Sequence, residues 1–189
     1  MQVSGLRADP RSPHRSGSTM LPVELRLPTI VVPVRLALVG HEASGAELFV
    51  PDIPRRGRTH LVDDVAQVLE DPTGFLPVKV GDGVRLLGKH AICWISIGVA
   101  APDASPDFPQ ETSEVFTLYD RQHRVEIELL AGMRLTGTIL SSTPADRPRA
   151  IDHLNRAVHF VRLWTPENHF VINKTQIVGV TELTEGPPS

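Results

Sequence analysis

The sequence predicts a mainly β protein with some α structure (α+β), built from two tandem small β-barrel modules. Three observations carry this prediction. Two stretches of the chain share one order of apolar residues at a nearly constant spacing. Most segments alternate apolar and polar residues, which is typical of half-buried strands. One segment in each stretch instead has the spacing of an amphipathic helix.

The composition fits this fold class. The chain has 189 residues, of which 41% are hydrophobic, and this is enough for a packed core. Only 5% are aromatic, so the core must consist mostly of Val, Leu and Ile.

An internal repeat organises the chain. Phe75–Ile97 aligns without a gap with Phe160–Glu182, at an offset of 85 residues. Upstream, the offset grows to 89 and then to 91 or 92, while the apolar positions stay in the same order. Three pairs of identical charged residues also match between the copies: Lys89 with Lys174, Arg58 with Arg147, and Asp63 with Asp152. We interpret the pattern as an ancient tandem duplication.

The repeat sets the predicted domain boundaries. We expect a disordered tail over residues 1–20, a first barrel module over 21–98 and a second over 115–183. An acidic, proline-rich linker over 99–114 separates the modules, and 184–189 form a second tail. Met20 directly precedes the first patterned segment and is a second plausible start of translation.

In the first module, alternation predicts strands at 34–38 and 48–50, with Gly40 allowing a tight turn between them. The period then becomes helical over 61–69. Strands return at 75–80 and 84–87, around a Gly-Asp-Gly turn, and a last strand follows at 91–97.

The second module repeats this order. Strands are predicted at 125–129 and 135–140, with a turn at Gly132, and a helix at 150–158. The remaining strands are predicted at 160–164, 169–172 and 176–182. Each module therefore has the order β-β-α-β-β-β. A unit this small cannot build a good core under a flat sheet, so we expect a five-stranded barrel with the helix at one end.

Several function classes are disfavoured. The net charge is −3, which argues against a strongly basic nucleic-acid binder. Cys93 is the single cysteine, so an internal disulfide or a CxxC zinc site is excluded. The eight histidines show no metal-binding spacing, and no catalytic or nucleotide-binding motif occurs. We therefore expect no enzyme activity, no cofactor and no metal.

The apolar stretches are too short to span a bilayer, and the first residues lack the pattern of a secretory signal. We therefore expect no membrane contact and a cytoplasmic location.

The second module resembles the first two strands of an Sm-like barrel, through the run Val125-x-Ile127-x-Leu129-x-x-Gly132-x-x-Leu135-x-Gly137-x-Ile139. In the first module, Gly88-Lys89-His90-Ala91-Ile92 resembles the Lys-His segment of the bacterial host-factor branch. The resemblance implies that Lys89 and His90 contact the phosphate and base of single-stranded RNA, with Asn173 and Lys174 in that place in the second module. Each module also resembles a recurrent bacterial domain of uncharacterised function, which implies no chemistry.

The loop before each predicted helix is rich in arginine. Arg55, Arg56 and Arg58 lie near the helix N-terminus, where an anion or nucleotide ligand could bind. The corresponding loop of the second module holds Arg147 and Arg149. A structural role is the alternative, in which each arginine that matches between modules ties its loop to the aspartate five residues later. The matched lysines likewise have a structural alternative: packing over a barrel edge or pairing with an acid.

The leading functional hypothesis is a non-enzymatic binding or assembly module, whose partner is a protein or a second copy of the chain. Its basis is that the residues kept in both modules are core positions and a few charges at element ends. Duplicated barrels also offer edge strands for pairing. Binding of single-stranded RNA and binding of an anion or nucleotide ligand are the alternatives.

Overall fold

The computed structural model describes residues 28–52, 61–99, 119, 121–142, 150–156 and 158–183. The described part of the first half contains β1 (Thr29–Leu38), β2 (Ser44–Pro51), α1 (Leu61–Glu70), β3 (Phe75–Val80), β4 (Gly83–Gly88), the 3-10 turn η1 (Lys89–Ala91) and β5 (Ile92–Gly98). That of the second half contains β6 (Arg121–Leu129), β7 (Arg134–Ser141), α2 (Ala150–Leu154), β8 (Phe160–Trp164), β9 (Asn168–Asn173), η3 (Lys174–Gln176) and β10 (Ile177–Glu182).

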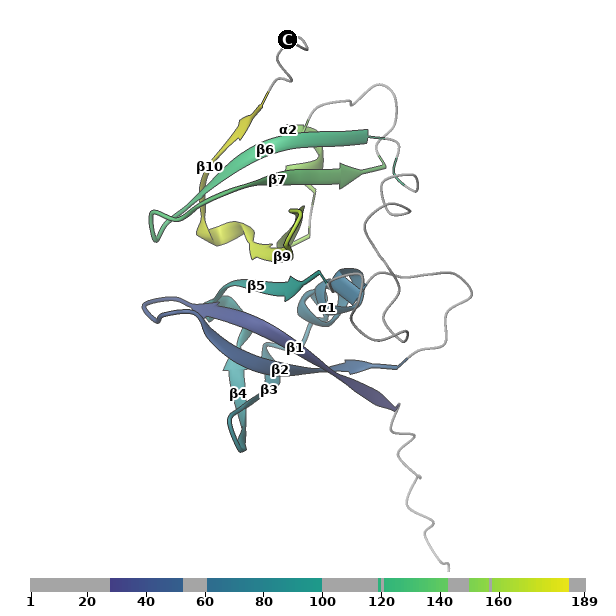
Figure 1. Cartoon of the computed structure of the whole chain (residues 1–189), viewed down its shortest axis with the longest axis vertical. Coiled ribbons are helices and arrows are strands. Elements are labelled where there is room, and N and C mark those ends of the chain that lie inside the picture. The colour runs from purple at the N-terminus through teal and green to yellow at the C-terminus, as the bar shows by residue number, and fades with distance from the viewer. Residues whose placement is uncertain are drawn as a thin grey trace, which may run out of the picture.

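The described strands form one sheet in the order β10-β6-β7-β8-β9-β5-β1-β2-β3-β4. The two halves therefore have the same internal arrangement, because in each the last strand lies beside the first and the others follow in sequence. Figure 1 shows the second half above the first, with β9 and β5 side by side where they meet.

The prediction of a mainly β fold with a little α structure is confirmed, but closed barrels are not formed: the described strands make a single open sheet. The reason is the partner of β5. It pairs antiparallel with β9 of the other half, from Trp94 opposite Ile172 to Gly98 opposite Asn168. We call this junction of β5 and β9 the seam.

The predicted strands all form, most of them one or more residues longer than the alternation indicated. Gly40 and Gly132 adopt positive φ angles of 73° and 76° in the matched turns, which agrees with the tight turns predicted at these two glycines. The helix predicted over 150–158 ends early, at Leu154. Lys174 Nζ donates to the carbonyls of Leu154 and Arg156, at 2.5 and 2.7 Å, so these carbonyls have a partner without a further helical turn.

Two apolar clusters form the core, and each contains side chains from both halves. The first joins the first half to Leu140, Phe160, Trp164 and Val171 of the second. The second cluster joins the second half to Ala37 and Trp94 of the first. Successive side chains of β9 alternate between the clusters, because neighbouring residues of a strand point to opposite faces.

Candidate functional site

The matched lysines bind the C-terminal end of the helix in their own half. Lys89 Nζ donates to the carbonyls of Val68 and Asp71, at 2.7 and 2.8 Å. Lys174 makes the corresponding bonds at the end of α2. A positive charge at this end stabilises the helix, because the last carbonyls lack partners and carry partial negative charge.

Desolvation lowers the pKa of Lys89, and the nearby Asp71 and Glu70 oppose this effect. Desolvation likewise lowers the pKa of Lys174, again opposed by Glu70. These contacts give the match between the two lysines a structural explanation. Binding of single-stranded RNA stays a prediction.

The structure brings together Lys89, His90 and Asn173, which line a pocket of about 270 Å³ at the seam. His90 is exposed. Asn173 is buried, and its side-chain amide donates to the carbonyl of Ile92 in β5 at 3.0 Å. Its side-chain oxygen accepts from the Thr175 amide at 3.0 Å. Asn173 therefore joins β9 to β5 and shapes the turn that follows.

The arginines of the predicted anion site lie outside the described residues. This concerns Arg55, Arg56, Arg58, Arg147 and Arg149. The tails at 1–20 and 184–189 and the linker beyond Val99 also lie outside the described part. The structure does give Asp63 a partner: its carboxylate accepts from the Arg162 guanidinium of the other half.

Helix α1 of the first half packs against β8 and β9 of the second. At its end, Glu70 accepts from the Phe160 amide at 2.7 Å and contacts the His159 ring nitrogen at 3.2 Å. Burial raises the pKa of Glu70, but these hydrogen bonds outweigh it and the pKa is lowered. The sequence reasoning missed Glu70 and Arg162, because their partners lie 90 and 99 positions away and nothing local signals such a pair.

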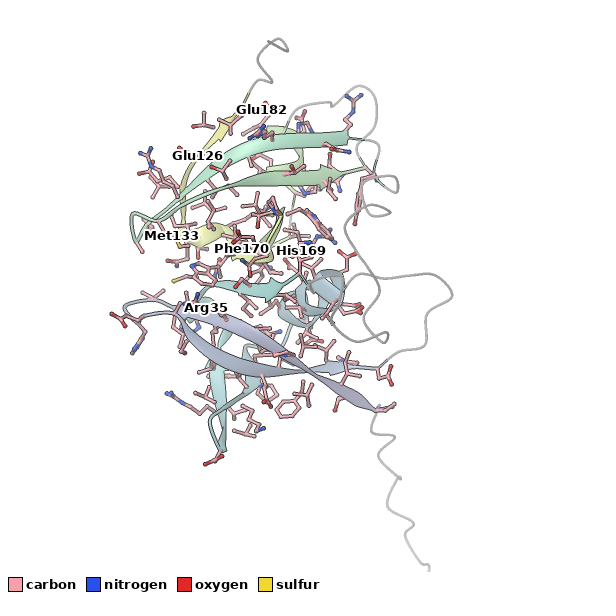
Figure 2. All side chains as sticks on the ribbon, viewed as in Figure 1. Arg35, Glu126, Met133, His169, Phe170 and Glu182 are labelled. Carbon is pink, nitrogen blue, oxygen red and sulfur yellow. The ribbon has the colours of Figure 1, made fainter. Side chains whose placement is uncertain are left out.

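The seam also contains an aromatic contact. The rings of Trp94 and Phe170 meet edge to face, with centroids 5.6 Å apart. Figure 2 shows Phe170 and His169 where the two halves meet, and Glu182 on β10 in the second half.

The two strands that end the sheet differ from the seam. On β3 and β4, four exposed apolar residues share one face, since Phe75 lies opposite Gly88, Pro77 opposite Leu86 and Lys79 opposite Val84. We call this set, Phe75, Pro77, Val84 and Leu86, the β3–β4 face. At the other end of the sheet, Val178 of β10 and Ile151 of α2 are exposed.

A small polar cluster lies inside the second half. In the described part of the chain, His123 Nε2, Ser141 Oγ and His153 Nδ1 are buried without a hydrogen-bond partner. His123 Nδ1 contacts Glu182 at 2.9 Å. Burial, helped by the charges of Arg156 and Arg162, lowers the pKa of His153 to about 4.

Among the described residues, no group of three His, Cys, Asp or Glu side chains is placed to hold a metal ion. The helices of the described part are too short or too polar to cross a bilayer. Compared with known proteins, the chain matches no protein-family model, no curated protein and no solved structure.

Proposed function

We propose that the chain is a non-enzymatic assembly module that binds protein through the ends of its sheet. The observation that carries this proposal is the β3–β4 face. Its apolar side chains lie beside the outer edge of β4, where backbone N–H and C=O groups can pair with an added strand.

Sheet edges in proteins are commonly protected by charged residues, prolines or bulges. In β4 the sequence is Gly-Val-Arg-Leu-Leu-Gly, so Arg85 is its single charged residue. Val84 and Leu86, on either side of it, are both exposed. An apolar strand of this kind gains free energy when a second strand covers it, because both apolar area and backbone polar groups leave water.

The lysines support this choice of site indirectly. Lys89 and Lys174 already donate to helix carbonyls, so an RNA ligand would have to compete for them. The outer edge of β4 offers backbone N–H and C=O groups, which can bind a partner strand without breaking such contacts.

Site-specific photo-crosslinking tests the proposal. A photoreactive amino acid is introduced at Leu86, and the full chain is produced in its native cells. We expect protein adducts on irradiation. The matched control is the same substitution at Leu130, an exposed leucine in the turn between β6 and β7. Equal yields at both positions, or none at Leu86, would refute the proposal.

A further inference from the structure

The seam shows how one half of this molecule covers the other. Two contacts join the halves. Strand β5 of the first half pairs with β9 of the second. Helix α1 of the first half packs against β8 and β9 of the second. Each half also contains the counterpart of what the other contributes, because their strand orders are the same. The first half therefore presents β4 and the β3–β4 face, and the second half presents β10 and α2.

The exposure of matched residues follows this division. Val171 of β9 is 0% exposed, whereas Leu86, 85 residues earlier, is 71% exposed. Phe160 is 7% exposed, whereas its match, Phe75, is 62% exposed. Each pair has the same position in its strand and a similar side chain. The difference arises because β5 and α1 lie over the second half, and within the described residues no element lies over the first.

The covering side shows the same asymmetry. On the helices, Val62 of α1 is 1% exposed, whereas its match, Ile151 of α2, is 53% exposed. On the strands, β5 is buried along most of its length, whereas every residue of β10 is exposed or partly exposed. Among the described residues, the β3–β4 face is thus exposed at one end of the sheet, and β10 and Ile151 of α2 are exposed or partly exposed at the other.

We infer that the partner of β4 is β10 of a second copy of this chain, paired antiparallel in the register of the seam. The inference rests on the proposed function and names its partner. In this register Leu86 lies opposite Val180, Arg85 opposite Thr181, and Val84 opposite Glu182. Helix α2 of the second copy then covers the β3–β4 face, with Ile151 at the position that matches Val62 of α1.

Charge disfavours one symmetric alternative. The single charged residue of β4 is Arg85. A pairing of two β4 strands centred on Arg85 would place two arginines opposite each other, and like charges across a strand pair are destabilising. A head-to-tail contact leaves one β4 and one β10 unused, so assembly continues until a ring closes or a filament forms.

The contact between copies is weaker than the seam. The edge-to-face contact of Trp94 and Phe170 has no equivalent, since the matched residues are Gly179 and Arg85. Lys79 stands where the second half has the buried Trp164. We therefore expect association that depends on protein concentration.

Complementation of two blocked variants tests the pairing. Leu86→Lys blocks β4, and Thr181→Arg blocks β10 by facing Arg85; both residues are exposed, so both variants should fold. In sedimentation velocity we expect the unmodified chain to exceed a dimer. Each variant alone should be a monomer, and their equimolar mixture a dimer.

Each other outcome overturns the inference. The inference is wrong if the unmodified chain stays monomeric at its highest soluble concentration. It is also wrong if the mixture stays monomeric while both variants keep the urea unfolding midpoint of the unmodified chain. A blocked variant that still dimerises alone would indicate symmetric pairing instead.

Cysteine pairs test the register. In a Cys93→Ala background, Leu86→Cys with Val180→Cys should yield disulfide-linked multimers on mild oxidation. The control pair, Arg85→Cys with Val180→Cys, places the thiols on opposite faces and should yield far fewer. Equal yields would overturn the register. In the photo-crosslinking experiment, adducts of Leu86 that contain only other proteins overturn this inference and leave the proposed function intact.

Discussion

The seam and the two ends of the sheet are built from matched strands, yet they differ in almost every surface property. At the seam, β5 and β9 pair, α1 lies over β8 and β9, and the side chains between them are buried. At the ends, most residues of β4 are exposed, and those of β10 are exposed or partly exposed. The burial of a residue in this fold therefore depends on the neighbouring half more than on its own strand.

The largest expected difference is between two phenylalanines at matched positions. Phe160→Ala removes a side chain buried at the seam and should lower the free energy of unfolding by about 3–5 kcal/mol. Phe75→Ala removes an exposed one and should change it by about 0.5 kcal/mol or less. Urea unfolding of both variants at low protein concentration measures the difference. Similar losses would show that the ends are covered within a single chain.

The second prediction concerns His153, whose neutral form is favoured by burial. Its pKa is about 4 in the folded protein and about 6.5 in the unfolded chain. A lowered histidine pKa gives stability that is present above pH 6.5 and lost as the pH falls toward 4. The loss should approach about 3 kcal/mol.

Replacing His153 by Gln should flatten the profile in this window, as measured by urea unfolding from about pH 7.5 to pH 4. Glu70, whose pKa is lowered from 4.5, contributes only at the acidic end of this range, so Glu70→Gln should leave the slope above about pH 5 unchanged and is the control. An unchanged slope in His153→Gln would contradict the assignment.

The third prediction compares the lysines that bind the helix ends. Lys89→Met and Lys174→Met leave two carbonyls without a charged donor, and each should lower the free energy of unfolding by about 1–2 kcal/mol. The control is Lys79→Met, which removes a solvent-exposed ion pair with Glu47 and should cost less than about 1 kcal/mol. A functional lysine without a structural role would show no loss of stability.

The smallest expected effect concerns association between copies. Thr181 lies opposite Glu126 of its own chain, so the test uses a Glu126→Gln background. In that background, Thr181→Glu should place a carboxylate opposite Arg85 of the neighbouring copy and strengthen the contact by about 0.2–1 kcal/mol. Sedimentation equilibrium would show a dissociation constant lowered by up to about fivefold, and high salt should remove the gain. The same substitution with Arg85→Ala should show no gain.

Much of the fold could be predicted from the sequence, because alternation and helical spacing are local signals. The strand and helix order followed from them, and the glycines of the two first turns were identified from their positions. What β5 pairs with could not be predicted. Curling each half into its own barrel and pairing the halves both satisfy the same local pattern, and only contacts between distant residues distinguish them.

The candidate site was predicted less well. Matching between the halves identified Lys89 and Lys174. Such a match can have a structural or a functional cause, and here each lysine binds the end of a helix. Asn173 was named for its place beside Lys174, and it joins the seam. Phe75 and Leu86 carry no sign of exposure in the sequence, because a core strand and an uncovered strand have the same composition.

The strand β9 places Val171 in one core cluster and Ile172 in the other, and both side chains are fully buried. Unfolding of either half would expose part of this strand and cost the other half its packing. We therefore expect the two halves to melt in one cooperative transition, and amides along β5 and β9 to exchange with solvent only when the whole molecule opens. Although its sequence repeats, the described part of the chain should then behave as a single folding unit.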